Sequence, residues 1–357
     1  MNKEDKTFEK SAVFIDWYAQ NLRKLPWRET KDPYFIWISE IILQQTRVIQ
    51  GMKYYIRFIK CFPNVEILAK ASREEVLKLW QGLGYYSRAR NLHEAAKEIM
   101  TRFGGRFPQK YEDILSLKGI GCYTAAAIAS IAWNQPYPVI DGNVFRVLGR
   151  LFAVETPTDT AEGKKLYSEL AHRIMNPEQA GLHNQAVMEF GALQCVPQNP
   201  DCSRCPLQHQ CRGYAGGKPQ QYPVRHRKAK TRDRYFHFMY ITYNNVYTYL
   251  CRRNEKDIWN GLFEFPMIET AQPADFDELK ETDEFKRLFP PDSHAVFTLD
   301  KSGVRHILTH QVLHATFYRV EIRMESEALK DCLRISLQEM SDYPVPRLIH
   351  RYLSDVM

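Results

Sequence analysis

The 357-residue sequence has no apolar run that approaches the roughly 20 residues needed for a membrane-spanning helix. It also lacks the apolar segment of a secretory signal peptide, because residues 1–10 are of mixed charge and no such segment follows them. These absences predict a protein that is not associated with a membrane and that works in a bacterial-type cytoplasm. Disulfides are disfavoured in that compartment, so the eight cysteines need another explanation.

Two more absences concern the organisation of the chain. No internal repeat with a period of about 20 to 50 residues is visible. Up to about residue 212 the polar and apolar alternation of strands is almost missing, and helical periodicity predominates. The chain is long enough for two or three domains, each with its own core. We therefore predict an all-α domain over residues 1–212.

The composition changes after residue 212. Residues 213–234 are rich in glycine, proline and basic side chains, which predicts a linker with a basic stripe. Beyond it, aromatic and β-branched stretches are separated by turn signals such as Tyr243-Asn244-Asn245. Residues 235–357 are therefore predicted to form an α+β domain. The net charge of +7 is compatible with a polyanionic partner but does not prove one.

Four cysteines gather in residues 195–211, with the spacing C-x6-C-x2-C-x5-C: Cys195, Cys202, Cys205 and Cys211. Thiolates clustered in this way in a reducing compartment bind a metal centre. Zinc is one candidate, but zinc ribbons usually join two separate C-x2-C pairs. The single close pair favours a compact [4Fe–4S] cluster. The other cysteines are scattered and are predicted to be plain thiols: Cys61, Cys122, Cys251 and Cys332.

An apolar helix is expected from about Tyr34 to Gln50, with Glu40 in its middle. A buried carboxyl is costly unless it is paired, and burial raises its pKa. On spacing alone, an ion pair with Arg47 and a functional role for Glu40 are equally open.

Leu117 to Gly121 has the form of a helix-hairpin-helix turn, in which Gly119 and Gly121 let the backbone approach a phosphate. An ordinary turn between two helices is the simpler explanation of G-x-G by itself. Asp141 lies 20 residues beyond the hairpin, before an amphipathic helix. A lone aspartate in that position is usually the N-cap of the helix. The combination of hairpin and aspartate is what indicates a functional site.

Together, the hairpin, the Val139–Val144 segment and the cysteine spacing resemble the helix-hairpin-helix base-excision DNA glycosylases of the endonuclease III type, over about residues 7–212. Within that superfamily the chain looks most like the adenine DNA glycosylases, which remove adenine mispaired with 8-oxoguanine. Trp259–Pro266 resembles their Nudix-like, lesion-reading domain. Four further segments carry the resemblance: Leu25–Arg28, Ser39–Thr46, Gly82–Tyr86 and Asn184–Glu189.

The resemblance implies roles for individual residues. Glu40 would protonate the departing adenine, and Asp141 would stabilise the oxocarbenium-like sugar. Tyr123 and Asn143 would position the nucleophilic carboxylate and the water. The remaining implied residues form the adenine pocket, the DNA contacts and the lesion reader: Trp27, Arg28 and Glu189; Gln45, Tyr85, Gly119 and Gly121; Thr309 and His310.

The sequence departs from related enzymes in three places. Bifunctional glycosylase/lyases carry a lysine just after the hairpin, where this chain has Tyr123, which cannot form an imine. The resemblance therefore implies a monofunctional glycosylase. The Phe-Ser-His tip of the family is Leu308-Thr309-His310 here, so the stacking ring is replaced. The acidic box of Nudix hydrolases is missing, and no nucleotide hydrolysis is expected.

Two rival functions fit parts of the sequence. A thymine glycosylase acting on G:T mismatches could share Tyr123, but Glu40 and the additional C-terminal domain argue against it. A non-catalytic iron–sulfur protein that binds DNA and senses redox state would need neither Glu40 nor Asp141. The expected partner is duplex DNA that contains A:8-oxoguanine or A:G mispairs. We expect the enzyme to be a monomer and to be associated with the nucleoid through this DNA.

Overall fold

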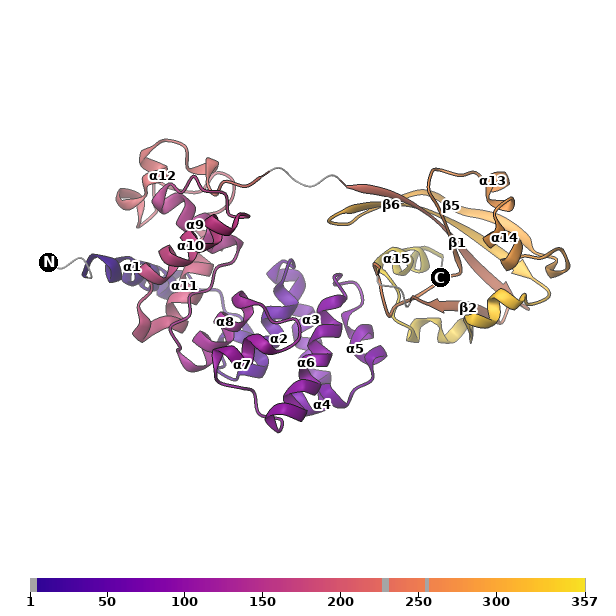
Figure 1. Cartoon of the computed structure of the whole chain (residues 1–357), viewed down its shortest axis with the longest axis horizontal. Coiled ribbons are helices and arrows are strands. Elements are labelled where there is room, and N and C mark those ends of the chain that lie inside the picture. The colour runs from indigo at the N-terminus through magenta and orange to yellow at the C-terminus, as the bar shows by residue number, and fades with distance from the viewer. Residues whose placement is uncertain (1–4, 227–230, 254–256, 357) are drawn as a thin grey trace. The chain divides into compact units, whose positions relative to one another are not determined.

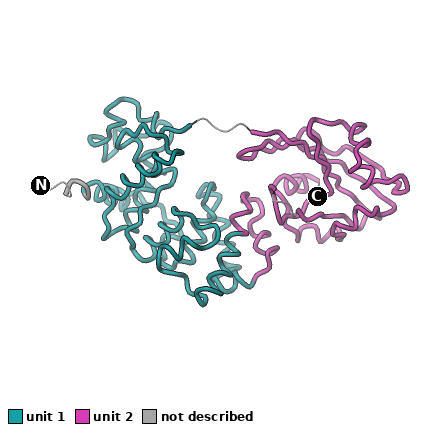
Figure 2. Tube along the Cα trace, viewed as in Figure 1, with its two compact units in different colours: residues 1–70, 91–227 teal, residues 71–90, 228–357 magenta. Residues whose placement is uncertain are grey.

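The computed structural model describes residues 5–226, 231–253 and 257–356 (Figure 1). The chain divides into two compact units (Figure 2). The first unit comprises residues 1–70 and 91–227, and the second comprises residues 71–90 and 228–357. The domain boundaries at residues 212 and 235 remain a prediction.

The first unit is helical throughout its described residues, which confirms the all-α prediction. Its helices are α1 (Asp5–Asn21), α2 (Pro33–Leu43), α3 (Val48–Cys61), α4 (Val65–Lys70), α7 (Tyr111–Ser116), α8 (Cys122–Trp133), α9 (Gly142–Phe152), α10 (Ala161–Ile174), α11 (Ala180–Leu193) and α12 (Arg212–Ala215). The long α6 (Ser87–Phe103) begins in the second unit and continues into the first. Short 3-10 turns include Pro26–Arg28 and Pro177–Gln179.

The expected continuous helix from Tyr34 to Gln50 is wrong. The structure has two helices, because α2 ends at Leu43 and α3 begins at Val48. The break contains Gln45, whose φ of 55° is left-handed and cannot belong to a right-handed helix. Apolar periodicity continues across the break and therefore conceals it at the level of sequence.

Helix α8 occupies a central position in the first unit, packed against α2, α7 and α11. Most of its residues are buried, and their small side chains let neighbouring backbones approach closely. At Gly181 of α11, an added Cβ would lie 2.5 Å from the carbonyl oxygen of Ser130. Close packing therefore fixes the position of α11 relative to α8, and with it the side chains that both helices contribute to one cavity.

The second unit contains a seven-stranded sheet with the order β3-β2-β1-β6-β5, in which β4 also pairs with β1 and β7 with β2. The long strands β1 (Arg232–Tyr243) and β6 (Gln311–Ile322) are parallel, and the other pairs are antiparallel. The remaining strands are β2 (Tyr247–Arg252), β3 (Phe263–Glu264), β4 (Met267–Thr270), β5 (Val296–Ile307) and β7 (Leu333–Ser336).

Helices cover both faces of this sheet, as alternation along β1 requires. Phe236 and Phe238 belong to the core beneath α15 (Arg347–Val356). Met239 and Ile241 belong to a second core beneath α13 (Phe276–Lys280) and α14 (Asp283–Leu288). The predicted α+β architecture is confirmed, and α5 (Arg73–Trp80) is part of the same unit.

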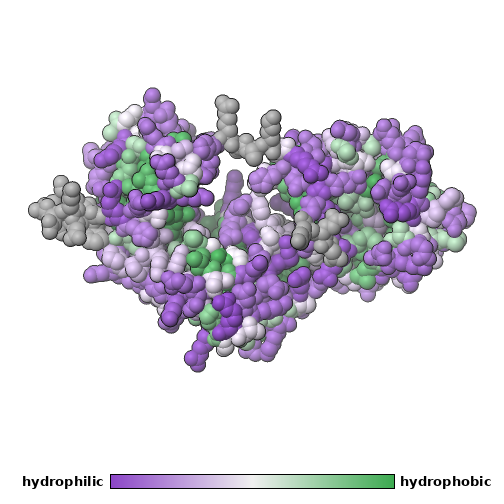
Figure 3. Space-filling model, in the orientation of Figure 1, coloured by the Kyte–Doolittle hydropathy of each residue, from purple (hydrophilic) through white to green (hydrophobic). Residues whose placement is uncertain are grey.

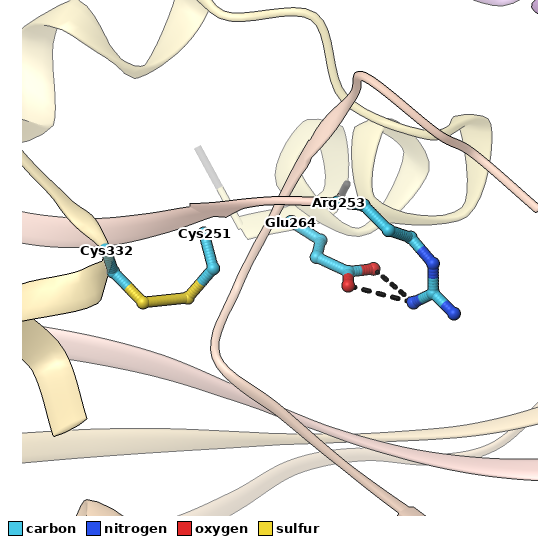
Figure 4. Close-up of a disulfide and its surroundings, with 4 residues drawn as sticks. All are labelled: Cys251, Arg253, Glu264 and Cys332. Carbon is cyan, nitrogen blue, oxygen red and sulfur yellow. Dashed lines mark hydrogen bonds and ion pairs between the residues drawn. A yellow bond between two sulfur atoms is a disulfide. The ribbon is translucent and has the colours of Figure 1, made fainter. Parts of the chain in front are cut away.

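The treatment of Cys251 and Cys332 as plain thiols is wrong, because the two form a disulfide (Figure 4). Pairing of β2 with β7 places Leu250 opposite Leu333, and the neighbouring cysteines then face each other. They are 81 residues apart in sequence, so only the strand register brings them together. Cys61 and Cys122 are free and exposed, as expected.

The surface seen in Figure 3 is mainly hydrophilic, with small separate apolar patches. Among the residues that the structure describes, no helix is both long and apolar enough to cross a membrane.

Candidate active site

A cavity of about 530 Å³ opens in the first unit. It is lined by side chains from the Pro26–Arg28 turn, α2, α8, α9 and α11, and from the break between α2 and α3. Eight residues singled out from the sequence line this one cavity: Trp27, Arg28, Glu40, Gln45, Tyr123, Asp141, Asn143 and Glu189.

Glu40 lies on α2 and is only 8% exposed. Its partner is Tyr123 of α8, whose hydroxyl donates to Glu40 Oε2 over 2.6 Å; the alternative partner, Arg47, is not bonded to it. Burial raises the pKa of the Glu40 carboxyl to about 7, although the hydrogen bond from Tyr123 opposes the shift. The nearby Asp141 raises this pKa further. A carboxyl of this kind can hold and release a proton near neutral pH.

Asp141 caps α9, as the simpler reading of the sequence predicts. Its Oδ1 accepts from the backbone N–H of Val144 and its Oδ2 from the amide of Asn143, both over 2.8 Å. Burial is the largest influence on the carboxyl and raises its pKa, while these hydrogen bonds act in the opposite direction. Both acids are therefore desolvated, and Asp141 differs from Glu40 in accepting two N–H donors that favour its charged form.

Arg146, which sequence reasoning missed, holds Asn143 in place. Its Nη2 donates to Asn143 Oδ1 over 2.9 Å and to the carbonyl oxygen of Gly191 over 2.5 Å. Because Oδ1 is occupied in this way, the Asn143 amide group is directed towards Asp141. Arg146 Nε also donates to the carbonyl oxygen of Cys195 over 2.7 Å, so one guanidinium connects the cavity with the cysteine segment. Its position one turn after Asn143 on the same helix was the available signal.

Glu189 of α11 has a fully buried side chain that is held by two arginines. Arg28 donates to both of its oxygens over 2.8 and 2.7 Å, and Arg23 does so over 2.8 and 2.5 Å. Burial by itself would raise the pKa of Glu189, but the hydrogen bonds from the arginines lower it to about 2. Arg23 was not identified from the sequence.

Of the two glycines in the hairpin, only Gly119 is required by the shape of the backbone and the space around it. Gly119 has a φ of 77°, and an added Cβ would lie 2.5 Å from Cβ of Asn91. Gly121 is the N-cap of α8, and an added Cβ there would meet nothing within 4 Å. The open space at Gly121 leaves the start of α8 accessible to an anion.

Tyr85, Thr309 and His310 belong to the second unit. Tyr85 is half exposed with a left-handed φ of 49°, and its hydroxyl shares a 2.8 Å hydrogen bond with Thr309 Oγ1. Thr309 and His310 are exposed at the turn between β5 and β6. Leu308 instead packs partly buried against the core beneath α15.

The four clustered cysteines line a second, small cavity of about 30 Å³. The buried Arg150 holds this segment, since it donates to Cys195 Sγ over 3.3 Å and to the carbonyl oxygens of Val196 and Pro197. Burial raises the pKa of Cys205 to about 11, so thiolates here need compensating positive charge. Across the described residues, no three His, Cys, Asp or Glu side chains stand close enough together to hold a single metal ion.

Gly191 offers a test of how tightly the cavity is packed. An added Cβ would lie 2.6 Å from Cβ of Asn143, so Gly191→Ala should displace α9 and lower any activity of this site at least about tenfold, with a stability loss of about 1–3 kcal/mol. The matched control is Gly216→Ala, because a Cβ there approaches nothing closer than 3.5 Å. Single-turnover rates and melting temperatures measure the two effects. Equal rates and equal melting temperatures for the two variants would contradict the prediction.

Comparison with known proteins gives consistent matches. Residues 38–172 match the HhH-GPD superfamily of base excision DNA repair proteins, and residues 237–355 match a NUDIX domain. An adenine DNA glycosylase of Buchnera aphidicola is 38% identical over 262 residues, which cover 73% of this chain and 75% of the relative. The human adenine DNA glycosylase is 44% identical over 208 residues, or 56% of this chain and 38% of the relative. A solved thermostable thymine-DNA glycosylase aligns with a TM-score of 0.55 at 30% identity, covering 60% of this chain and 98% of that protein.

Proposed function

This chain belongs to the adenine DNA glycosylase family, and from that premise we propose that it acts on adenine mispaired with 8-oxoguanine or guanine in duplex DNA. The enzyme hydrolyses the N-glycosidic bond of adenine in DNA. The observation that carries the proposed mechanism is the contact of Tyr123 with Glu40 in the cavity that also holds Asp141 and Asn143.

The adenosine must leave the base stack before its glycosidic bond can be reached, at a cost of a few kcal/mol. In the proposal the flipped base occupies the 530 Å³ cavity, and Gln45 at its edge fills the gap that the base leaves. Tyr85 is assigned to DNA contact as well. The hairpin at Gly119 and Gly121 holds a phosphate, which recognises the backbone and no particular base.

Glu40 acts as the general acid. Adenine is a poor leaving group as an anion, so protonation on its ring at N7 makes departure possible. A carboxyl with a pKa of about 7 is protonated in a large fraction of molecules at neutral pH. Because the Tyr123 hydroxyl occupies Oε2, the transferable proton belongs on Oε1.

Asp141 stabilises the positive charge that develops on the sugar as the base departs, or bonds to it transiently. Its two N–H donors hold the carboxylate in one orientation without a rearrangement during the reaction. Asn143 positions this carboxylate together with the attacking water. Tyr123 occupies the place of the lyase lysine, so the product is an abasic site in an intact strand.

The adenine pocket is formed by Trp27, Arg28 and Glu189. Trp27 is buried and packs edge-to-face on Tyr55, which gives the pocket a rigid apolar wall. Glu189, with its pKa lowered to about 2, accepts hydrogen bonds only. Both of its oxygens already accept from Arg23 and Arg28, so its part in the pocket is to hold these two arginines in place.

The cofactor in this proposal is a [4Fe–4S] cluster held by Cys195, Cys202, Cys205 and Cys211. The support for this assignment is that all four cysteines line one cavity and that Arg150 donates to Cys195 Sγ there. When bound, the cluster would cross-link residues 195–211 and supply the positive charge that buried thiolates require.

Lesion reading is assigned to Thr309 and His310. The hydrogen bond between Thr309 and Tyr85 supports this assignment, because it joins two residues chosen independently from the sequence. Leu308 is partly buried against the core beneath α15, so it does not present a fully exposed apolar side chain in place of the missing aromatic ring. A monomeric state, a cytoplasmic location and the absence of nucleotide hydrolysis remain predictions.

Duplexes with a single A:8-oxoguanine, A:G or T:G pair, treated with enzyme and then with alkali to break abasic strands, test this function. The proposal predicts that the adenine strand breaks at the adenine in the A:8-oxoguanine and A:G duplexes. The break should appear only after treatment with alkali. Breakage of the T:G duplex alone would favour the rival thymine glycosylase. A redox sensor would bind these duplexes and release no base.

A further inference from the structure

Helix α3 presents a basic face that the proposed mechanism does not use. Residues 41–65 contain four basic residues and no acidic one. On α3 itself the exposed positions recur at helical spacing. They are Ile49, Gln50, Lys53, Ile56, Arg57, Lys60 and Cys61. The opposite face carries Gly51, Tyr55 and Phe58 into the core, which fixes the outward direction of the basic face.

Two charges on this face, those of Lys53 and Lys60, are available to a ligand. Within the described part of the chain, neither Lys53 nor Lys60 has a carboxylate within 4 Å. The guanidinium of Arg57 stacks 5.0 Å from the ring centre of Tyr54, which orients it on the helix surface. Two isoleucines stand exposed among these cations, Ile49 at 87% and Ile56 at 50%.

The basic face starts at the cavity. Thr46 and Val48 line the cavity, Gln45 at its edge is exposed, and Ile49 follows directly on α3. With a rise of about 1.5 Å per residue, Lys53 lies about 7 Å along the axis from Val48 and Lys60 about 18 Å. At about 3.4 Å per nucleotide, these distances correspond to about two to five nucleotides from the base in the cavity.

We propose that Lys53, Arg57 and Lys60 of α3 form a second line of contact with the DNA backbone, separate from the hairpin, that holds the strand two to five nucleotides from the flipped adenine. The proposal rests on the assignment of duplex DNA as the substrate. Continuity with the cavity favours DNA over a membrane surface or an acidic protein, and Ile49 and Ile56 would meet the sugars between the phosphates.

The test is the salt dependence of binding to a duplex with one A:8-oxoguanine pair, compared between the full-length enzyme and Lys53→Gln/Lys60→Gln. Each lost phosphate contact lowers the slope of log K against log salt by about 0.9, so the slope should fall by about 2. Base release in single turnover at saturating enzyme should not change, because neither lysine lines the cavity. Lys164→Gln/Lys165→Gln on α10, equally exposed and of the same charge change, is the control and should keep the wild-type slope.

Lys53→Arg/Lys60→Arg tests whether the effect of the Gln variant comes from lost charge or from a change in local structure. The Arg variant keeps both positive charges and should therefore retain the wild-type slope. The proposal is overturned if the Gln variant keeps the wild-type slope, if the α10 control loses as much, or if the Arg variant behaves like the Gln variant. If base release is lost in all variants and in the wild type, the assigned function fails, whereas a change in slope would still support the contact with DNA.

Discussion

Glu40→Gln is expected to lower the rate of adenine release by at least about 10³-fold, because the substitution removes the carboxyl that is proposed to protonate the departing base. The affinity for DNA should stay within a few-fold of wild type, since glutamine keeps the size of the side chain and can still accept the hydrogen bond. Single-turnover base release and equilibrium binding to the same duplex measure the two quantities.

The pH dependence provides a second readout for Glu40. The acid works only when protonated, and its pKa is about 7, so the wild-type rate should fall as pH rises above 7. Its folded-state pKa lies above the ordinary 4.5, so the folded state binds more protons than the unfolded state between pH 4.5 and 7. Ionised Glu40 therefore destabilises the protein as pH rises through that window.

Glu40→Gln should consequently be more stable than wild type at pH 8, by up to about 3 kcal/mol, while being inactive. Denaturant unfolding at pH 5 and pH 8 checks this, and the gain should disappear at the lower pH. A variant that is inactive and also destabilised at pH 8 would show that burial does not raise the pKa of Glu40. Near-wild-type turnover would refute the assignment of Glu40 as the acid.

Asp141→Asn is expected to lower base release by about 10³-fold, because a neutral amide cannot stabilise the developing positive charge on the sugar. The substitution should cost little stability, since the amide oxygen of asparagine can still cap α9 through Val144. Binding to the mispaired duplex should survive. Rate and melting temperature measured on one preparation distinguish loss of charge from loss of the cap.

Asp141→Ala should be measured beside Asp141→Asn, because alanine removes both the charge and the N-cap of α9. Its rate of base release should fall by a similar factor to that of Asp141→Asn, and its stability should be lower by an additional ~1 kcal/mol. If Asp141→Asn retains more than about a tenth of the wild-type rate while Asp141→Ala does not, the aspartate serves α9 and not the sugar.

Much of the fold follows from local patterns. Helical periodicity to about residue 212 and strand-like alternation beyond it are short-range signals, and both predicted classes are confirmed. The break between α2 and α3 was missed, because a single left-handed residue at Gln45 leaves no mark on hydrophobic periodicity. The disulfide of Cys251 with Cys332 was missed for a related reason, since it depends on the register of β2 against β7.

The candidate site shows the same division. An acid in an apolar helix and an aspartate beyond a glycine hairpin drew attention to Glu40 and Asp141, and the resemblance to the glycosylases then implied their roles. Arg23, which holds Glu189, and Arg146, which holds Asn143, could not be chosen by residue type, because an arginine on the surface and one that orients a site residue look alike in a sequence. Arg23 acquires its role only when α11 brings Glu189 to it across 166 residues.

The sequence by itself determined which chemical groups are available: two carboxylic acids, a tyrosine where a lyase has lysine, four clustered cysteines and a glycine hairpin. The tertiary structure alone decided which residues surround each group. Tyr123 meets Glu40 across 83 residues because the small side chains of α8 let α2 pack close against it. The same packing removes water from Glu40 and raises its pKa to about 7. A pKa is a property of surroundings, and the surroundings of Glu40 come from helices that are distant in the sequence.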